Sequence, residues 1–243
     1  MNGFKSVFKR EFKGYFATPV AYVFLVIFLF FSGYLTFKQG FFEARQADMH
    51  LFFENLPLLF VFIVPSVAMR LWAEERKTGS IELLFTLPIT VSQAVLGKFF
   101  AAWAFLAVGL GLTFPMPMTV SYLGNPDGGL IAAGYLASLL MAGGFLAIGI
   151  FFSALCKNQV ISFILSVVAC AVFVFSGMPS TMGYLDTFLP GGMVQAAAGL
   201  SFQNHFDSMQ KGIIRLSDLG YFAVMIAGWV YACTIILDER KAD

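Results

Sequence analysis

The side chains able to do chemistry are few in this chain of 243 residues, and they are scattered. A phosphate-binding loop needs two glycines and a Lys-Ser or Lys-Thr pair at fixed spacing, because backbone N–H groups and the lysine surround the phosphates. Gly97-Lys98 is followed by Phe99, and Ser92 stands where the first glycine should be. We therefore expect no ATP hydrolysis by this route and no cofactor bound by the chain.

Metal binding and nucleophilic catalysis are also poorly supported. The two histidines, His50 and His205, lie far apart in the sequence, which disfavours a metal site. Ser162 and Ser166 have no base in the same apolar stretch, so we interpret them as helix-packing hydroxyls. The three cysteines have no paired spacing and are interpreted as apolar fillers: Cys156, Cys170 and Cys233. The sequence thus predicts no catalytic and no metal-binding residue.

A different kind of site is indicated by residues 74–93, a polar insertion between two apolar stretches. Gly79 can act as a helix N-cap, Glu82 then favours the helix dipole, and Pro88 ends the helix by Leu87. The resulting helix has about two turns and cannot be stable alone in water. Because its side chains are mostly apolar, it must dock against the membrane surface or another protein.

The elements that carry this insertion belong to a membrane protein. The chain is 59% hydrophobic and 12% charged, whereas soluble domains are about 45–50% apolar and about 25% charged. The net charge of +1 gives no reason to expect nucleic acid as a partner. Six stretches have the length and apolar character of membrane-crossing helices: Pro19–Phe37, Leu56–Ala73, Phe99–Val120, Ile131–Leu155, Val160–Gly177 and Leu219–Leu237.

Six crossings place both termini on one side of the membrane. With the termini in the cytoplasm, eleven of the 15 Lys and Arg residues lie inside, as the positive-inside rule requires. Arg70 is the one charged residue within the six stretches and is close enough to an end to reach the interface. Without buried ionisable side chains, a proton-coupled carrier or a voltage sensor is disfavoured. An external motor acting on the cytoplasmic insertion is the natural inference.

Two further segments lie outside the six stretches. Residues 1–18 carry apolar side chains every four positions beside a row of lysines, which predicts an amphipathic helix in the membrane interface: Phe4, Phe8, Phe12 and Phe16, with Lys5, Lys9 and Lys13. Residues 178–218 are apolar but interrupted by Gly and Pro, which predicts a re-entrant outer segment between the fifth and sixth crossings. The expected fold is therefore an all-α integral membrane protein formed by one domain, residues 1–243.

Glu75-Arg-Lys-Thr-Gly-Ser-Ile-Glu-Leu-Leu with Pro88 resembles the cytoplasmic signature of ABC-2 type permeases, the membrane subunits of type V ABC transporters. The order of the segments is similar too. Phe206-Asp-Ser-Met-Gln-Lys-Gly-Ile-Ile-Arg-Leu-Ser-Asp218 resembles the gliding-motility-associated (GldF-like) group of these permeases. The resemblance covers nearly the whole chain.

The resemblance implies a role for each matching segment. Residues 74–93 would contain a coupling helix that enters a groove in a separate cytoplasmic ATPase, and residues 157–159 would be a second contact with it. Residues 1–18 would be the connecting helix, and residues 178–205 would gate the outer end. The implied ATPase-coupling residues are Glu74, Glu75, Arg76, Lys77, Gly79, Ser80, Ile81, Glu82, Leu83, Leu84, Pro88, Lys157, Asn158 and Gln159.

The resemblance also implies partners and a location. The ATPase would bind ATP and Mg, a second copy or a related permease would complete the transporter, and an accessory membrane protein with a large outer domain is expected. The protein would contact membrane lipids in the bacterial inner membrane. One alternative is a scaffold that anchors an ATPase and transmits force to an envelope partner without transport. A channel or carrier independent of ATP leaves residues 74–88 unexplained, and the substrate cannot be deduced.

Overall fold

The computed structural model describes residues 3–41, 48–82, 88–188, 192 and 198–242, and this part of the chain is helical without strands. Five helical segments are long and apolar enough to cross a membrane. Helix α9 (Gln159–Phe175) is apolar but has 17 residues, the lower limit of the roughly 17–25 residues that a crossing needs. The five longer segments are Pro19–Lys38, His50–Thr78, Val91–Leu123, Gly128–Leu155 and Leu216–Glu239.

The helices begin and end close to the apolar stretches, but the second one is longer than expected. Helices α3 (His50–Ala68) and α4 (Arg70–Thr78) together replace the predicted stretch Leu56–Ala73. At the early end, Asn55 exchanges two side-chain hydrogen bonds of 2.9 Å with Gln39, the residue that caps the C-terminus of α2 (Pro19–Lys38). Polar residues therefore continue the helix beyond its apolar part, because their side chains are paired there.

Proline separates two pairs of helices. Helix α6 (Val91–Gly111) begins at Thr90, whose side chain accepts a hydrogen bond from Gln93 N–H at 3.3 Å, and α7 (Pro115–Leu123) follows a short break. A proline ring excludes the preceding residues from regular helix and removes a donor. The predicted third crossing, Phe99–Val120, is thus divided before Pro115. Likewise, α1 (Gly3–Ala17) is separated from α2 at Pro19.

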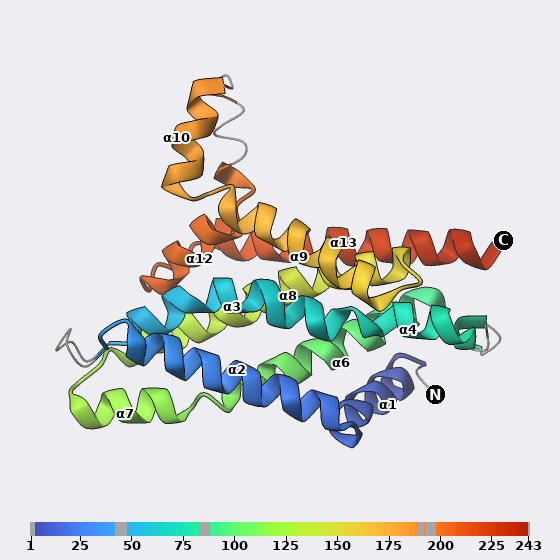
Figure 1. Ribbon diagram of the computed structural model, residues 1–243, viewed down its shortest axis with the longest axis horizontal. Helices are drawn as coiled ribbons and strands as arrows, with labels where there is room; N and C mark the ends of the chain where they lie inside the picture. The colour runs from blue at the N-terminus through green and yellow to red at the C-terminus, as the bar shows by residue number, and fades with distance from the viewer. Residues whose placement is uncertain (1–2, 42–47, 83–87, 189–191, 193–197, 243) are drawn as a thin grey trace.

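In the described part of the predicted outer segment, residues 178–218, helices α10 (Pro179–Phe188) and α12 (Phe202–Gln210) have different surroundings. Helix α10 extends away from the other helices (Figure 1). Helix α12 packs on α8 (Gly128–Leu155), and the side chains of Phe202, Phe206 and Met209 are buried. Residues 189–191 and 193–197 of the predicted re-entrant segment lie outside the described residues.

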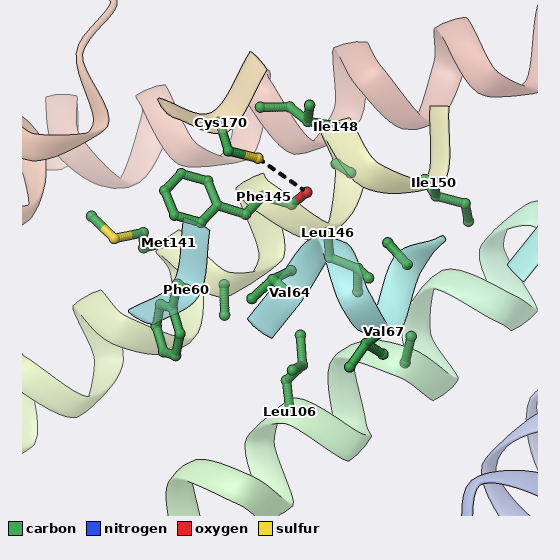
Figure 2. Close-up of a cluster of buried hydrophobic side chains, with 14 of the residues drawn as sticks. Phe60, Val64, Val67, Leu106, Met141, Phe145, Leu146, Ile148, Ile150 and Cys170 are labelled. Carbon is green, nitrogen blue, oxygen red and sulfur yellow. Dashed lines mark hydrogen bonds between the residues drawn. The ribbon is translucent and has the colours of Figure 1, made fainter. Parts of the chain in front are cut away.

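Helix α8 lies at the centre of the core. Figure 2 shows its Met141, Phe145 and Leu146 beside α3, with Leu106 of α6 and Cys170 of α9 close by. Small residues permit this close approach. A Cβ atom on Gly149 would overlap the side chain of Ala68, and one on Gly134 would overlap the ring of Phe53.

Both termini lie at the same end of the molecule, together with α4. The last helix, α13 (Leu216–Ala242), runs back to that end from the region of α12 (Figure 1). We call the end with both termini the terminal end and the opposite one the α12 end. Residues 74–82 of the predicted coupling segment are at the terminal end, so the structure separates them from the predicted outer segment.

Candidate functional site

Lys98 is the centre of a buried polar cluster at the terminal end. Its side chain is 2% exposed, and its ammonium donates a hydrogen bond of 2.7 Å to Glu75 Oε1 and one of 2.9 Å to the carbonyl of Leu71. Glu11 Oε1 lies 3.6 Å away, and the ring of Trp72 is 4.8 Å from Nζ. A buried ammonium needs such partners because the loss of water is costly. The cluster therefore ties α1 and α4 to α6.

Sequence reasoning considered Lys98 only as part of a failed phosphate loop and missed this cluster. The partners lie 87 and 23 positions away, at Glu11 and Glu75, in separate segments. No spacing in a single sequence specifies such a pairing. The one available signal was that a lysine stands just before an apolar helix with unassigned carboxylates elsewhere on the same side.

Ser153 of α8 bridges the break between α3 and α4. Its hydroxyl accepts hydrogen bonds from the N–H groups of Trp72 and Ala73, at 3.0 and 3.1 Å, and donates one of 3.0 Å to the carbonyl of Met69. The first N–H groups of a helix lack partners within that helix. One hydroxyl can donate once and accept twice, so Ser153 uses its full hydrogen-bonding capacity to fix α4 on α8.

Arg76 makes a second connection between α4 and α8. Its guanidinium Nη1 donates hydrogen bonds of 2.7 Å to the carbonyls of Ala154 and Leu155. These carbonyls are at the C-terminus of α8, where a cation is favoured by the helix dipole. The contact brings α4 next to the predicted second contact, residues 157–159. Within it, Lys157 and Asn158 are exposed, and Asn158 Oδ1 caps α9 by accepting from Val160 N–H at 2.9 Å.

Within the predicted coupling segment, residues 74–93, the expected coupling helix begins where α4 ends. Gly79 has φ +73°, in the left-handed region that favours glycine, and closes α4. Its carbonyl also accepts from Glu82 N–H at 3.3 Å, and residues 80–82 are helical, with the Ser80 hydroxyl 2.9 Å from that of Thr78. Gly79 is therefore the junction of two helical pieces. It ends α4 in addition to the expected role of N-cap for the helical residues that follow.

Exposure divides the remaining predicted coupling residues into two groups. Glu74, Lys77, Glu82 and Pro88 are exposed, whereas Ile81 packs against the core of the protein. Leu83 and Leu84 lie outside the described residues. The polar members at the terminal end can thus contact another molecule, while Glu75 and Arg76 are engaged within the chain.

Helix α1 is bound to α6 through aromatic side chains. The expected row of phenylalanines forms a ladder with ring centroids 6.2, 5.8 and 5.2 Å apart from Phe4 to Phe16. Tyr15 stacks on Phe105 of α6 at 4.8 Å, and its burial raises the pKa of the hydroxyl, to which nearby Glu11 adds. The lysines of the expected cationic row are exposed: Lys5, Lys9 and Lys13.

A second polar group lies at the α12 end. His205 Nδ1 is 2.7 Å from Asp218 Oδ1, and its ring stacks on Tyr221 with centroids 4.0 Å apart. Gln210 donates a hydrogen bond of 3.1 Å to the carbonyl of His50 and so joins α12 to α3. Burial raises the pKa of the nearby Asp207 carboxyl, against the lowering effect of its hydrogen bond from Gln203. These contacts fix α12 to the bundle.

An all-helical bundle with several segments long and apolar enough to cross a membrane defines a multi-pass membrane protein. The model of the ABC-2 family transporter proteins matches residues 6–237, nearly the whole chain, and the chain belongs to this family. No curated protein matches the chain. Membership supports a membrane permease of an ABC transporter, a class that normally pairs with a cytoplasmic ATPase.

Proposed function

We propose that the chain is the permease subunit of an ABC transporter and couples ATP hydrolysis by a separate ATPase to export of a substrate or to force transmission. The observation that carries this proposal is the match to the ABC-2 family over residues 6–237. The terminal end supports it physically. Exposed polar residues stand there on a helix that Lys98, Ser153 and Arg76 fix to the core.

In this proposal, residues 74–93 enter the ATPase and residues 157–159 form a second contact. Glu74, Lys77 and Glu82 make the polar contacts, and Leu83 and Leu84 make apolar ones. A push on α4 passes directly to α8 because Ser153 and Arg76 join the two helices. The chain itself is not an enzyme, and the ATPase binds ATP and Mg. Energy enters through the different affinity of two permease conformations for the nucleotide-loaded ATPase.

The proposed arrangement has six membrane crossings, with α9 as the fifth. Both termini are cytoplasmic and the membrane is the bacterial inner membrane, in keeping with the positive-inside rule. Residues 178–218 form the outer segment, and residues 178–205 within it gate the pathway. Two permease subunits assemble with two ATPases, and the resemblance of residues 206–218 to the GldF-like group adds an accessory membrane protein with a large outer domain.

Co-purification from the native host tests the coupling. The tagged chain is extracted in mild detergent, and accompanying proteins are identified and quantified by mass spectrometry. We expect a stoichiometric soluble ATPase with the wild type and its loss in Leu84→Asp and Glu82→Arg. Leu216→Asp is the matched control, because Leu216 is 86% exposed at the α12 end.

Two results would contradict the proposal. A chain that arrives without an ATPase, or with an outer-domain protein alone, argues for a channel or carrier independent of ATP. Retention of the ATPase by both Leu84→Asp and Glu82→Arg shows that residues 74–93 are not the docking segment. Equal membrane levels of all variants ensure that loss of the ATPase does not reflect loss of the chain.

A further inference from the structure

A polar cavity of about 400 Å³ opens between α1, α4 and α6 at the terminal end. Its volume is within the range of small-ligand sites, about 300–1,000 Å³. Its walls carry both signs of charge: two cations, Arg70 and Lys98, and three carboxylates, Glu11, Glu74 and Glu75. The hydroxyl groups of Thr18 and Ser80 also line it.

Two buried side-chain atoms of residues that line this cavity lack a hydrogen-bond partner among the described residues. They are Nε of Arg70, which is a donor, and Oε2 of Glu75, which is an acceptor. Lys98 does not satisfy Glu75 Oε2, because its ammonium is bonded to the other oxygen, Oε1. Buried polar atoms without partners are costly. A ligand that fits this cavity must therefore offer an acceptor to Arg70 and a donor to Glu75.

An apolar groove adjoins the polar cavity. It has a volume of about 20 Å³ and is lined by α2, α3 and α6, including Phe24, Phe60 and Leu106. A single water-sized group fills about 10–15 Å³, so the groove receives one or two methylene-sized groups of an acyl chain that lies along its opening. The groove is lined without any charged side chain, and it lies within helices long and apolar enough to cross the membrane.

Residues that line the groove lie close to residues that line the cavity at three places. Val67 of the groove and Leu71 of the cavity are about one helical turn apart. On α6, Lys98 and Phe105 are about two turns apart. Tyr15 of the cavity stacks on Phe105 of the groove, with centroids at 4.8 Å. The apolar groove thus lies next to the polar cavity, farther from the terminal end along the same helices.

We propose that these two spaces form a site for one phospholipid with a phosphoethanolamine headgroup, taken from the leaflet at the terminal end. The phosphate accepts from Arg70, the ammonium donates to Glu75 Oε2, and an acyl chain follows the groove. Charge selects this headgroup. A headgroup with only negative charge would be repelled by the three carboxylates. A ligand with only positive charge would leave Arg70 without an acceptor. The proposal depends on insertion in a membrane but not on coupling to an ATPase.

Binding of defined lipids to the purified, delipidated chain tests the site. Native mass spectrometry and thermal unfolding would be measured with dioleoyl phosphatidylethanolamine, phosphatidylcholine and phosphatidylglycerol. We expect one phosphatidylethanolamine per chain, bound about tenfold more tightly than phosphatidylglycerol, since a charge-assisted hydrogen bond contributes that much. Phosphatidylcholine should bind more weakly than phosphatidylethanolamine, because its quaternary ammonium has no N–H donor.

Variants separate the headgroup from the chain. Arg70→Gln should weaken phosphatidylethanolamine binding about tenfold or more, and Arg215→Gln, an exposed arginine at the α12 end, should leave it unchanged. Gly109→Val fills the groove, where a Cβ already meets Leu25 Cδ2 at 3.1 Å. It should weaken binding of the lipid but not of glycerophosphoethanolamine, which has no acyl chain.

Equal affinity for phosphatidylethanolamine and phosphatidylglycerol would overturn the proposal. If folded Arg70→Gln binds phosphatidylethanolamine with wild-type affinity, the proposed phosphate contact is wrong. If Gly109→Val binds it with wild-type affinity, the groove does not hold the acyl chain. If Arg70→Gln does not fold, the lipid series on the wild type and Gly109→Val still decide the question. Loss of the ATPase in pull-downs would leave all of these results unaffected.

Discussion

At the scale of single residues, Lys98 shows how a charge far from water can define a structure. Its ammonium has a carboxylate, a backbone carbonyl and an indole ring around it, each from α4, and Glu11 of α1 nearby. Such a group contributes little net stability over an apolar replacement, but removal of one member leaves the others buried and unpaired. Its value lies in specifying which helices meet.

Substitution of Lys98 alone should therefore lower the free energy of unfolding more than joint substitution of Lys98 and Glu75. Lys98→Met is expected to lower the free energy of unfolding by about 3 kcal/mol, because Glu75, whose side chain is 21% exposed, loses its ion-pair partner. In Lys98→Met/Glu75→Met much of this loss should be recovered. Unfolding by denaturant in detergent micelles gives the values for Lys98→Met, for Glu75→Met and for the double variant. If the double variant is destabilised by the sum of the single effects, the two side chains do not interact.

The candidate site was only partly predictable at this scale. The charged residues at 74–77 were identified because they interrupt an apolar pattern, but their partners were not. Arg76 was expected to face an ATPase, and the structure shows it on the carbonyls of Ala154 and Leu155. Charge in a sequence indicates that a residue needs a partner. It does not say whether that partner is in the same chain.

At the scale of elements, α3 and α4 form one long helical segment, and hydrogen bonds satisfy the backbone groups at the break between them. Pro65 lies one turn before Met69, whose N–H bonds back to the Pro65 carbonyl at 2.9 Å, and Ser153 supplies partners for the N–H groups just beyond. The break thus leaves few groups unsatisfied. Helix α4 thus stays packed on α8 beyond the break, as α3 does before it.

Loss of the Ser153 hydroxyl should destabilise this junction. Ser153→Ala leaves two buried N–H groups without an acceptor, at a cost of about 1–3 kcal/mol. Ser166→Ala is the control, since Ser166 is equally buried but bonds only to the carbonyl of Ser162 within its own helix, at 2.7 Å. Hydrogen exchange of the Trp72 and Ala73 amides measures the effect. Equal protection in both variants would contradict it.

The helices themselves were largely predictable, and their ends were not. Apolar runs of about 20 residues located α2, α8 and α13 to within a few positions, because a membrane admits little else. The starts of α3 at His50 and α6 at Val91 were missed. Polar residues can continue a helix beyond the hydrocarbon when caps or side-chain pairs satisfy them, and hydropathy does not detect this.

At the scale of the whole molecule, the two ends differ in construction. The terminal end gathers α1, α4 and the connection of α8 to α9 around charged contacts, whereas the α12 end is closed by the aromatic and polar contacts of α12 (Figure 1). Phe202 alone contacts the rings of Phe145, Phe173 and Phe222. Motion produced at one end must cross this packed core to reach the other.

Site-directed labelling tests the orientation of these ends in the membrane. In a Cys156→Ala background, Lys9→Cys and Tyr122→Cys place thiols on exposed positions of α1 and α7. A maleimide that cannot cross membranes should label Tyr122→Cys in spheroplasts and Lys9→Cys only after permeabilisation. The reverse pattern would invert the proposed orientation, and labelling of both from outside would place the termini outside the cytoplasm.

The position of Trp72 against Lys98 gives the protein an intrinsic optical signal. An indole in contact with a cation differs in emission from one in a purely apolar environment, and Trp103 and Trp229 are both placed away from this cluster, on Leu139 and on Phe151. Movement of α4 relative to α6 would change the distance between the Lys98 ammonium and the Trp72 ring. Fluorescence of the chain could thus follow events at the terminal end in real time, without an attached dye.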